Sequence, residues 1–173
     1  MHSLLLGLTI AMTAPGAAGP DLPPLQTVPH VDLNRYLGRW YEIAAFPQRF
    51  EKGCTETTAT YSLRPDGDIA VMNECVDCRN GKRRIARGKA WVTDRATMAK
   101  LRVRFFWPFS GAYWIIDLGH DYEYAVVGHP ARTYLWILSR TPKMDDAVYN
   151  AILKRLTGAS YDVTKLVKTK QTG

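Results

Sequence analysis

The stretch Gly38-Arg39-Trp40-Tyr41-Glu42-Ile43 begins a series of short segments in which apolar and polar residues tend to alternate. The alternation is clearest at residues 100–105, where three basic residues are interleaved with three apolar ones. Such segments, broken about every 8 to 12 residues by turn signals such as Pro65-Asp66-Gly67-Asp68, are typical of an antiparallel sandwich or barrel. We predict eight strands, near residues 39–46, 56–63, 68–75, 84–92, 99–106, 112–118, 122–128 and 133–140.

After Arg140 the periodicity changes from that of a strand to that of a helix. Asp145 and Asp146 suit the beginning of a helix, and Gly158 suits its end. Between them lies an apolar stripe at helical spacing, with Val148, Ile152 and Leu156 as its main members. A short final strand is expected within residues 161–167. These elements predict an all-β fold, an eight-stranded antiparallel up-and-down β-barrel with one C-terminal α-helix packed outside, of a size that holds one small ligand.

The chain has 173 residues, enough for one domain with a sizeable core. Residues 1–18 have the features of a secretory signal peptide, because an apolar stretch too short to cross a bilayer is followed by small residues. We expect an extended leader at residues 19–30, a single domain at 31–168 and a tail at 169–173. Since no cysteine lies near the predicted cleavage point after Ala18, we expect a soluble periplasmic or secreted protein that is not lipid-anchored through an N-terminal cysteine.

The net charge of +7 makes the surface basic and favours anionic partners. Most basic residues are scattered over predicted strand faces, and the one tight run, Lys82-Arg83-Arg84, lies in a predicted hairpin loop. A nucleic-acid interface would need a basic groove with aromatic residues for stacking, and the sequence has no such pattern. We therefore predict no nucleic-acid partner and, at most, weak contact with an anionic membrane surface.

Several blocks of the sequence resemble those of one family. Gly38-Arg39-Trp40 resembles the Gly-x-Trp signature of lipocalins, and residues 134–142 resemble the closing strand of that family with its arginine, Arg140. Residues 119–122 are similar to the middle motif, and residues 61–67 resemble the bacterial, apolipoprotein D-like branch. These blocks occur in the family's order. The resemblance implies a protein that transports or scavenges a small lipophilic ligand of the fatty acid or lysophospholipid class.

The resemblance covers roughly residues 31–168, and it implies structural rather than ligand-binding roles for Gly38, Trp40 and Arg140. In lipocalins the arginine lies over the tryptophan at the closed end of the barrel, a cation–π contact. Strand parity agrees with this arrangement, because Trp136, Leu138 and Arg140 share one face of the predicted last strand.

Parity on the other strands predicts the residues that line the interior. We expect an enclosed set with several tyrosines and small residues to form a pocket, and the alternative is an ordinary packed core. Gly88 and Ala90 are small, which predicts space beside the fourth strand. The predicted ligand-binding residues are Tyr61, Val71, Ala90, Val103, Phe105, Tyr113, Ile115, Tyr124, Val126, Trp136 and Leu138.

The chain has three cysteines, Cys54, Cys75 and Cys78, and export makes a disulfide the expectation. If Leu63 pairs with Ile69 in the hairpin, the register places Cys54 opposite Cys78. The resemblance instead implies a Cys54–Cys75 bridge, which would require a bulge or a loose strand end. Both pairings remain open at the level of the sequence, and the first choice is Cys54–Cys75.

Catalysis is the main alternative to ligand transport. Some lipocalin relatives are enzymes, and Glu42, which shares parity with Trp40, is the acid that could act inside the barrel as part of an isomerase or hydrolase. The lone Cys75-x-x-Cys78 lacks a second pair for zinc, and the four histidines are isolated, so we predict no metal and no cofactor. A third possibility, an interaction module that uses the basic surface, would show binding that weakens steeply with salt.

Overall fold

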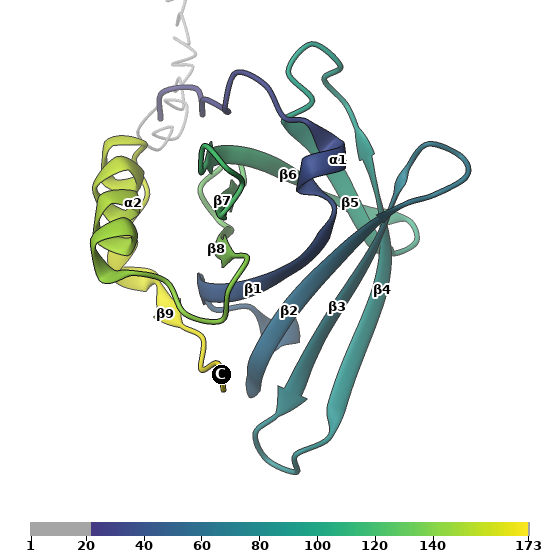
Figure 1. Cartoon of the computed structure of the whole chain (residues 1–173), viewed down its shortest axis with the longest axis vertical. Coiled ribbons are helices and arrows are strands. Elements are labelled where there is room, and N and C mark those ends of the chain that lie inside the picture. The colour runs from purple at the N-terminus through teal and green to yellow at the C-terminus, as the bar shows by residue number, and fades with distance from the viewer. Residues whose placement is uncertain (1–21, 173) are drawn as a thin grey trace, which may run out of the picture.

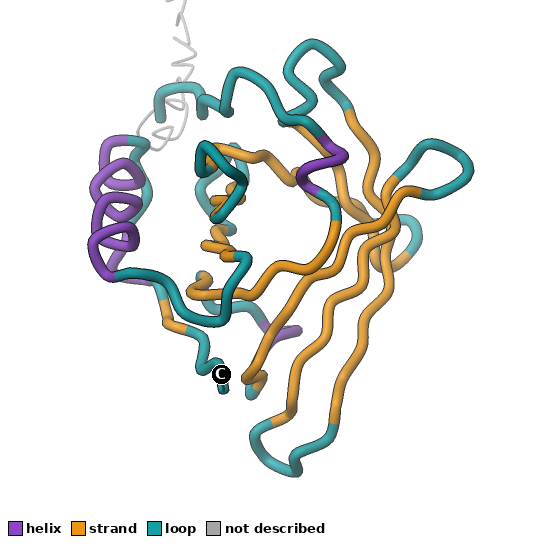
Figure 2. Tube along the Cα trace, viewed as in Figure 1, coloured by secondary structure: helices purple, strands orange, loops and turns teal. Residues whose placement is uncertain are grey.

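The computed structural model describes residues 22–172, so the predicted signal peptide at residues 1–18 lies outside the described residues. All eight predicted strands are present, and their bounds differ from the predicted ones by a few residues (Figures 1 and 2). They are β1 Gly38–Ala45, β2 Cys54–Leu63, β3 Ile69–Asp77, β4 Arg83–Val92, β5 Lys100–Phe106, β6 Phe109–Leu118, β7 Tyr124–Gly128 and β8 Leu135–Ser139.

The helical elements are α1 Leu33–Tyr36, α2 Asp146–Gly158 and the 3-10 turns η1 Arg49–Glu51 and η2 Val163–Lys165. Helix α2 begins as predicted, because the Asp145 carboxylate accepts hydrogen bonds from the N–H groups of Ala147 (2.8 Å) and Val148 (3.3 Å). The sequence did not predict α1. The expected final strand is limited to β9, Val167–Lys168.

The sheet closes into a barrel because β1 pairs with strands on both of its sides. The order along the sheet is β2-β3-β4-β5-β6-β7-β8-β1-β9, every pairing is antiparallel, and an additional β1–β2 pairing joins the ends. Figure 1 shows this ring with α2 packed against its outside. The predicted fold, an eight-stranded up-and-down barrel with one outer helix, is confirmed.

The pairing of β1 with β2 covers only half the height of the barrel, from Gly38–Tyr61 to Tyr41–Thr58. Beyond that point residues 167–171, here called the C-terminal seam, bridge the two strands. On one side, Ala44 pairs with Lys168. On the other, the Glu56 N–H donates to the Lys170 carbonyl (2.7 Å). The Gln171 side-chain amide donates to the carbonyls of Glu42 (2.8 Å) and Thr57 (2.9 Å), and so joins both strands.

The barrel has two ends of different character. The end that we call closed carries α1 and the turn at 64–68, and the preceding segment covers it, with the Val31 N–H donating to the Thr97 carbonyl (2.8 Å). The other end, the mouth, is formed by the loops 46–53, 78–82, 107–108 and 129–134.

The Cys54–Cys75 disulfide is present, and Cys78 stays an exposed thiol. The predicted Leu63–Ile69 register holds near the turn, but a bulge between Thr55 and Thr58 shifts it, so that Cys54 pairs with Asp77. The pairing of Cys54 with Cys78, which assumed an unbroken register, is therefore wrong.

Removing this disulfide is expected to destabilise the protein by about 3 kcal/mol, the value for a loop of this length in the chain-entropy model. Cys75→Ser should lower the midpoint of urea unfolding under non-reducing conditions. Cys78→Ser is the matched control and should leave the midpoint unchanged. Equal midpoints for Cys75→Ser and Cys78→Ser would show that the bridge does not form.

Candidate ligand-binding site

The closed end is sealed by Trp40 and Arg140. Trp40 is 0% exposed, and the Arg140 guanidinium carbon lies 3.7 Å from the centre of its ring. The indole Nε1 donates to the Tyr36 carbonyl (2.8 Å). Gly38 has φ +95°, a conformation that favours glycine, and a Cβ there would lie 3.4 Å from the Arg140 Nη1. These three residues form the base of the interior rather than its accessible part.

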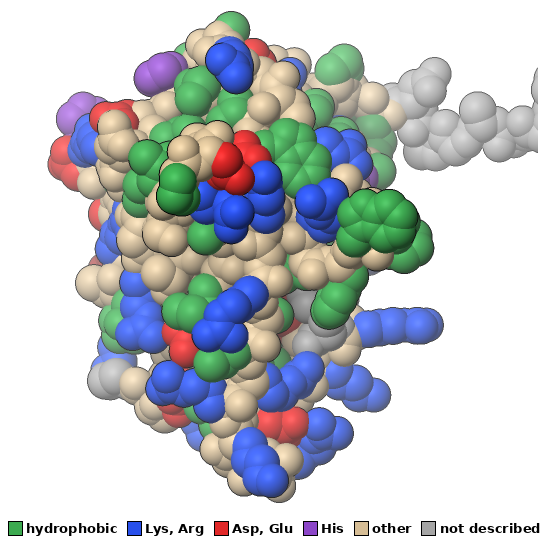
Figure 3. All heavy atoms as spheres, turned by 90° about the vertical axis from the view of Figure 1, so that its right-hand side faces the viewer, with side chains coloured by type: hydrophobic (Ala, Val, Ile, Leu, Met, Phe, Trp, Pro, Cys, Tyr) green, Lys and Arg blue, Asp and Glu red, His purple; other side chains and the backbone are tan. Residues whose placement is uncertain are grey.

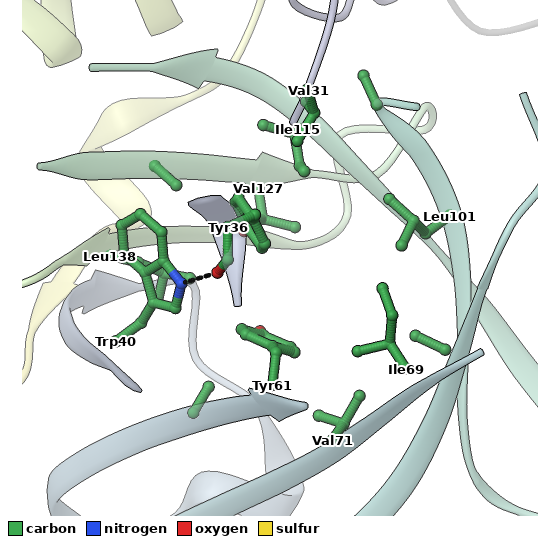
Figure 4. Packing of buried hydrophobic residues seen from close by; sticks show 14 of the residues in the cluster. Val31, Tyr36, Trp40, Tyr61, Ile69, Val71, Leu101, Ile115, Val127 and Leu138 are labelled. Carbon is green, nitrogen blue, oxygen red and sulfur yellow. Dashed lines mark hydrogen bonds between the residues drawn. The ribbon is translucent and has the colours of Figure 1, made fainter. Parts of the chain in front are cut away.

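Nine of the eleven predicted ligand-binding residues lie in the interior cluster or pack against it. Figure 4 shows how the labelled side chains of this cluster, which come from several strands, from α1 and from the segment before it, lie around one interior region. The nine residues are Tyr61, Val71, Ala90, Val103, Phe105, Tyr113, Ile115, Trp136 and Leu138.

The prediction for the seventh strand is wrong. Tyr124 and Val126 belong to the outer cluster under α2, whereas Ala125 and Val127 face the interior. Parity failed because α2 covers the outside of β7, so both faces of that strand are apolar. The outer location of Tyr124 is fixed by polar contacts, since its hydroxyl donates to Asp117 (3.3 Å) and accepts from Arg155 (3.0 Å).

The space predicted beside Gly88 is occupied. A Cβ on Gly88 would lie 2.8 Å from the Phe105 ring, so this ring packs directly on the glycine. The glycine therefore permits a large aromatic side chain to lie against β4 and does not leave an opening there.

Burial inside the barrel is graded from the closed end to the mouth. Trp40 and Ile115 are fully buried, whereas Val103, Phe105 and Trp136 point inward and are only partly buried. Side chains that face the interior and still contact solvent indicate that solvent reaches them through the mouth. These three side chains are therefore less completely buried than the residues that seal the closed end.

Three tyrosine hydroxyls meet in the interior. The Tyr113 hydroxyl lies 2.7 Å from that of Tyr36 and 2.8 Å from that of Tyr61. Burial raises the pKa of Tyr61 to about 12 and the pKa values of Tyr36 and Tyr113 well above the ordinary value, so all three stay protonated. Three O–H groups joined by two hydrogen bonds leave one proton to donate. The sequence did not identify Tyr36, because it comes from the unpredicted helix α1.

Two carboxyl groups lie at the mouth half of β1. Glu42 is buried and accepts a hydrogen bond from the Thr169 hydroxyl of the C-terminal seam. Glu51, from η1, accepts a hydrogen bond from the Trp136 indole (3.3 Å). Burial raises the pKa of both groups, and the charge of Glu42 helps to raise the pKa of Glu51 to about 8. The sequence indicated Glu42 but not Glu51, because Glu51 lies in a loop with no periodicity.

Two further polar atoms, Gln48 Nε2 and Asn73 Oδ1, are buried with no hydrogen-bond partner among residues 22–172. Asn73 lies on β3, two positions after the inward-facing Val71, and Gln48 lies in the loop that carries Glu51. Buried polar atoms normally have partners, so both are suited to contact a polar group of a ligand.

Two hollows lie on the outside of the barrel and could compete as binding sites. The larger, of about 570 Å³, is lined by residues 22–27, Lys100, Trp114 and residues 130–132. The smaller, of about 250 Å³, lies between Ile43, α2 and the C-terminal seam. Experiments on the interior must therefore distinguish it from the larger hollow.

Within the described part of the chain, no group of three or more His, Cys, Asp or Glu residues is placed to hold a metal ion. No helix in residues 22–172 is long and apolar enough to cross a membrane.

Comparison with known proteins places these features in a family. Residues 31–171 match the family model described as Lipocalin-like domain. The chain is 42% identical to the outer membrane lipoprotein Blc of Escherichia coli, over 98% of this chain and 97% of Blc. It is 42% identical to temperature-induced lipocalin-1 of Arabidopsis thaliana, over 85% and 83%, and 34% identical to apolipoprotein D of Bos taurus, over 86% and 80%. Among solved structures, insecticyanin from Manduca sexta has a TM-score of 0.71 at 22% identity, covering 87% of this chain and 86% of its own.

These relatives correct the expected location. The Blc proteins of Escherichia coli and Citrobacter freundii, each matched over 98% of this chain, are named outer membrane lipoproteins. The expectation of a soluble protein without a lipid anchor conflicts with that class and is wrong. It relied on one short segment near Ala18, and similarity along nearly the whole chain is the stronger criterion.

Proposed function

The chain belongs to the lipocalin family, whose members bind small hydrophobic ligands, and on that premise we propose that it carries a single-chain lipid, a fatty acid or lysophospholipid, inside the barrel. The observation that carries the proposal is the graded burial of the interior. Inward-facing Val103, Phe105 and Trp136 are partly exposed, whereas the Trp40 end is sealed. A chain that enters through the mouth meets apolar side chains and cannot pass through the base.

The energetics suit reversible transport. Removing about a dozen methylenes from water contributes on the order of 10 kcal/mol, at ~0.8 kcal/mol for each methylene. Association and ordering cost ~4–15 kcal/mol, so micromolar affinity is the expected scale and chain length the main determinant of selectivity.

The polar groups near the mouth supply contacts for the head of such a lipid. The Gln48 amide, in a mouth loop, is suited to donate to an ester or phosphate oxygen, and the Asn73 carbonyl oxygen is suited to accept from a hydroxyl. The spare proton of the tyrosine cluster lies deeper, toward the closed end, where it is available to an acceptor on the ligand. The alternative, catalysis by Glu42, has less support, because that carboxylate is engaged by Thr169 and Glu51 is engaged by Trp136. We propose that the two acids position these neighbours.

A dansyl-labelled fatty acid should bind one to one and be displaced by long-chain fatty acids or lysophospholipids. Trp136→Ala should weaken this binding by more than about 1 kcal/mol, because it removes a large apolar surface from the interior. The measurement is a fluorescence titration at low and at high salt. Cavity binding should change little between the two, whereas binding to the basic surface would weaken steeply.

Trp114→Ala is the matched control, since Trp114 is also partly buried but lines the outer hollow. It should leave probe affinity within about twofold of the unmodified protein. If Trp114→Ala removes binding and Trp136→Ala does not, the ligand site is the outer hollow and the interior proposal fails.

A further inference from the structure

The hairpin between β5 and β6 exposes three aromatic side chains at its tip. Phe106 is 77% exposed, Trp107 81% and Phe109 78%. Phe106 pairs with Phe109, so the connection consists of Trp107 and Pro108 alone, and none of the three rings belongs to the interior cluster. We call residues 106–109 the aromatic tip. These rings form a solvent-exposed cluster of large apolar side chains, and such a cluster indicates an interaction surface.

Positive charge without an acidic partner lies next to the aromatic tip. Arg102 and Arg104 are on the outer face of β5, and the pairing of Lys89 with Arg104 places the exposed Arg87 further toward the mouth on β4. Within residues 22–172, none of these three arginines forms an ion pair with a carboxylate, whereas Lys89 pairs with Asp66. Figure 3 shows the many Lys and Arg side chains on this face and the hydrophobic side chains that project at its edge.

We propose that the aromatic tip inserts into an anionic phospholipid surface while Arg87, Arg102 and Arg104 bind lipid phosphates around it. Aromatic residues prefer the boundary between headgroups and acyl chains, and basic residues near a membrane attract anionic lipids. A second copy of this chain is a poorer occupant, because two copies would bring the same arginines together.

This inference goes beyond cavity binding and does not depend on it. The test is co-sedimentation of the full chain with vesicles of phosphatidylcholine, with or without phosphatidylglycerol. A lipid taken into the cavity does not hold the protein on a vesicle, so sedimentation reports the surface alone. We expect binding to the anionic vesicles and at least about tenfold weaker binding of Trp107→Ser.

Leu63→Ser is the matched control, because Leu63 is 61% exposed and ends a strand at the closed end of the barrel. It should bind vesicles within about twofold of the unmodified protein. Arg87→Gln combined with Arg104→Gln should weaken binding to anionic vesicles by about tenfold and leave probe binding in the cavity intact.

Two measurements keep the proposal open to refutation if Trp107→Ser folds poorly. Trp107→Phe should retain vesicle binding within about threefold but lose the tryptophan emission that brominated lipids quench. The proposal is overturned if folded Trp107→Ser binds vesicles as tightly as the unmodified protein. It is also overturned if the protein ignores anionic vesicles and instead forms a dimer that this substitution dissociates.

Discussion

Arg140→Ala is expected to lower the free energy of unfolding by about 3 kcal/mol, the combined effect of a lost cation–π contact and of the loss of four charge-assisted hydrogen bonds to backbone carbonyls. The guanidinium donates to the carbonyls of Arg35 (2.6 Å), Arg39 (3.0 Å), Tyr36 (3.3 Å) and Tyr122 (3.3 Å). It thereby joins α1, β1 and the turn before β7. The melting temperature should fall by roughly 6–12 °C in a domain of this size.

Probe affinity of the folded Arg140→Ala protein should change by less than about twofold, because Trp40 separates this residue from the accessible part of the interior. Arg39→Ala is the matched control. Arg39 lies on the surface and forms an exposed ion pair with Glu74 (3.5 Å), so its loss should cost less than about 1 kcal/mol. If Arg140→Ala abolishes binding in a protein that still melts cooperatively, the closed end contributes to the ligand site and our placement of the site is wrong.

Glu51→Gln is expected to make the protein more stable at alkaline pH. The pKa of Glu51 is raised from 4.5 to about 8 in the folded state, so folding favours its protonated form. The stabilisation from this proton is complete at pH values below the pKa that Glu51 has in the unfolded chain, and it is lost as the pH rises through about 8. Glutamine remains neutral at every pH and keeps an oxygen that accepts from Trp136.

Thermal melts across pH test this expectation. At about pH 9 the variant should be more stable by at least ~2 kcal/mol, since each unit of pKa shift corresponds to ~1.4 kcal/mol. At about pH 4 the two proteins should be equally stable. The charge of Glu42 helps to raise the pKa of Glu51. In a protein that keeps Glu51, the substitution Glu42→Gln should therefore lower the pKa of Glu51 and shift the alkaline loss of stability to lower pH. A parallel pH dependence in the unmodified protein and Glu51→Gln would show that Glu51 is not buried as described.

The sequence predicted most of the barrel because its turn residues and its alternation are local signals. It failed at β7, where α2 makes the outer face as apolar as the inner one and parity has no polar marker to follow. It also failed at the disulfide register, because a bulge near Thr55 cannot be recognised from strand spacing. Tyr36 and Glu51 were missed since both belong to short irregular elements that only the closed barrel brings next to the interior.

The C-terminal seam has a consequence for the order in which the protein can fold. Strand β1 completes its pairing only with segments that are synthesised much later, since its partners in β8 follow more than 90 positions later and those in the C-terminal seam more than 120 positions later. Until those residues are available, the Glu42 half of β1 is an unpaired strand edge, the kind of surface on which chains aggregate. Such distant contacts place folding in the slow, millisecond-to-second range of β-proteins.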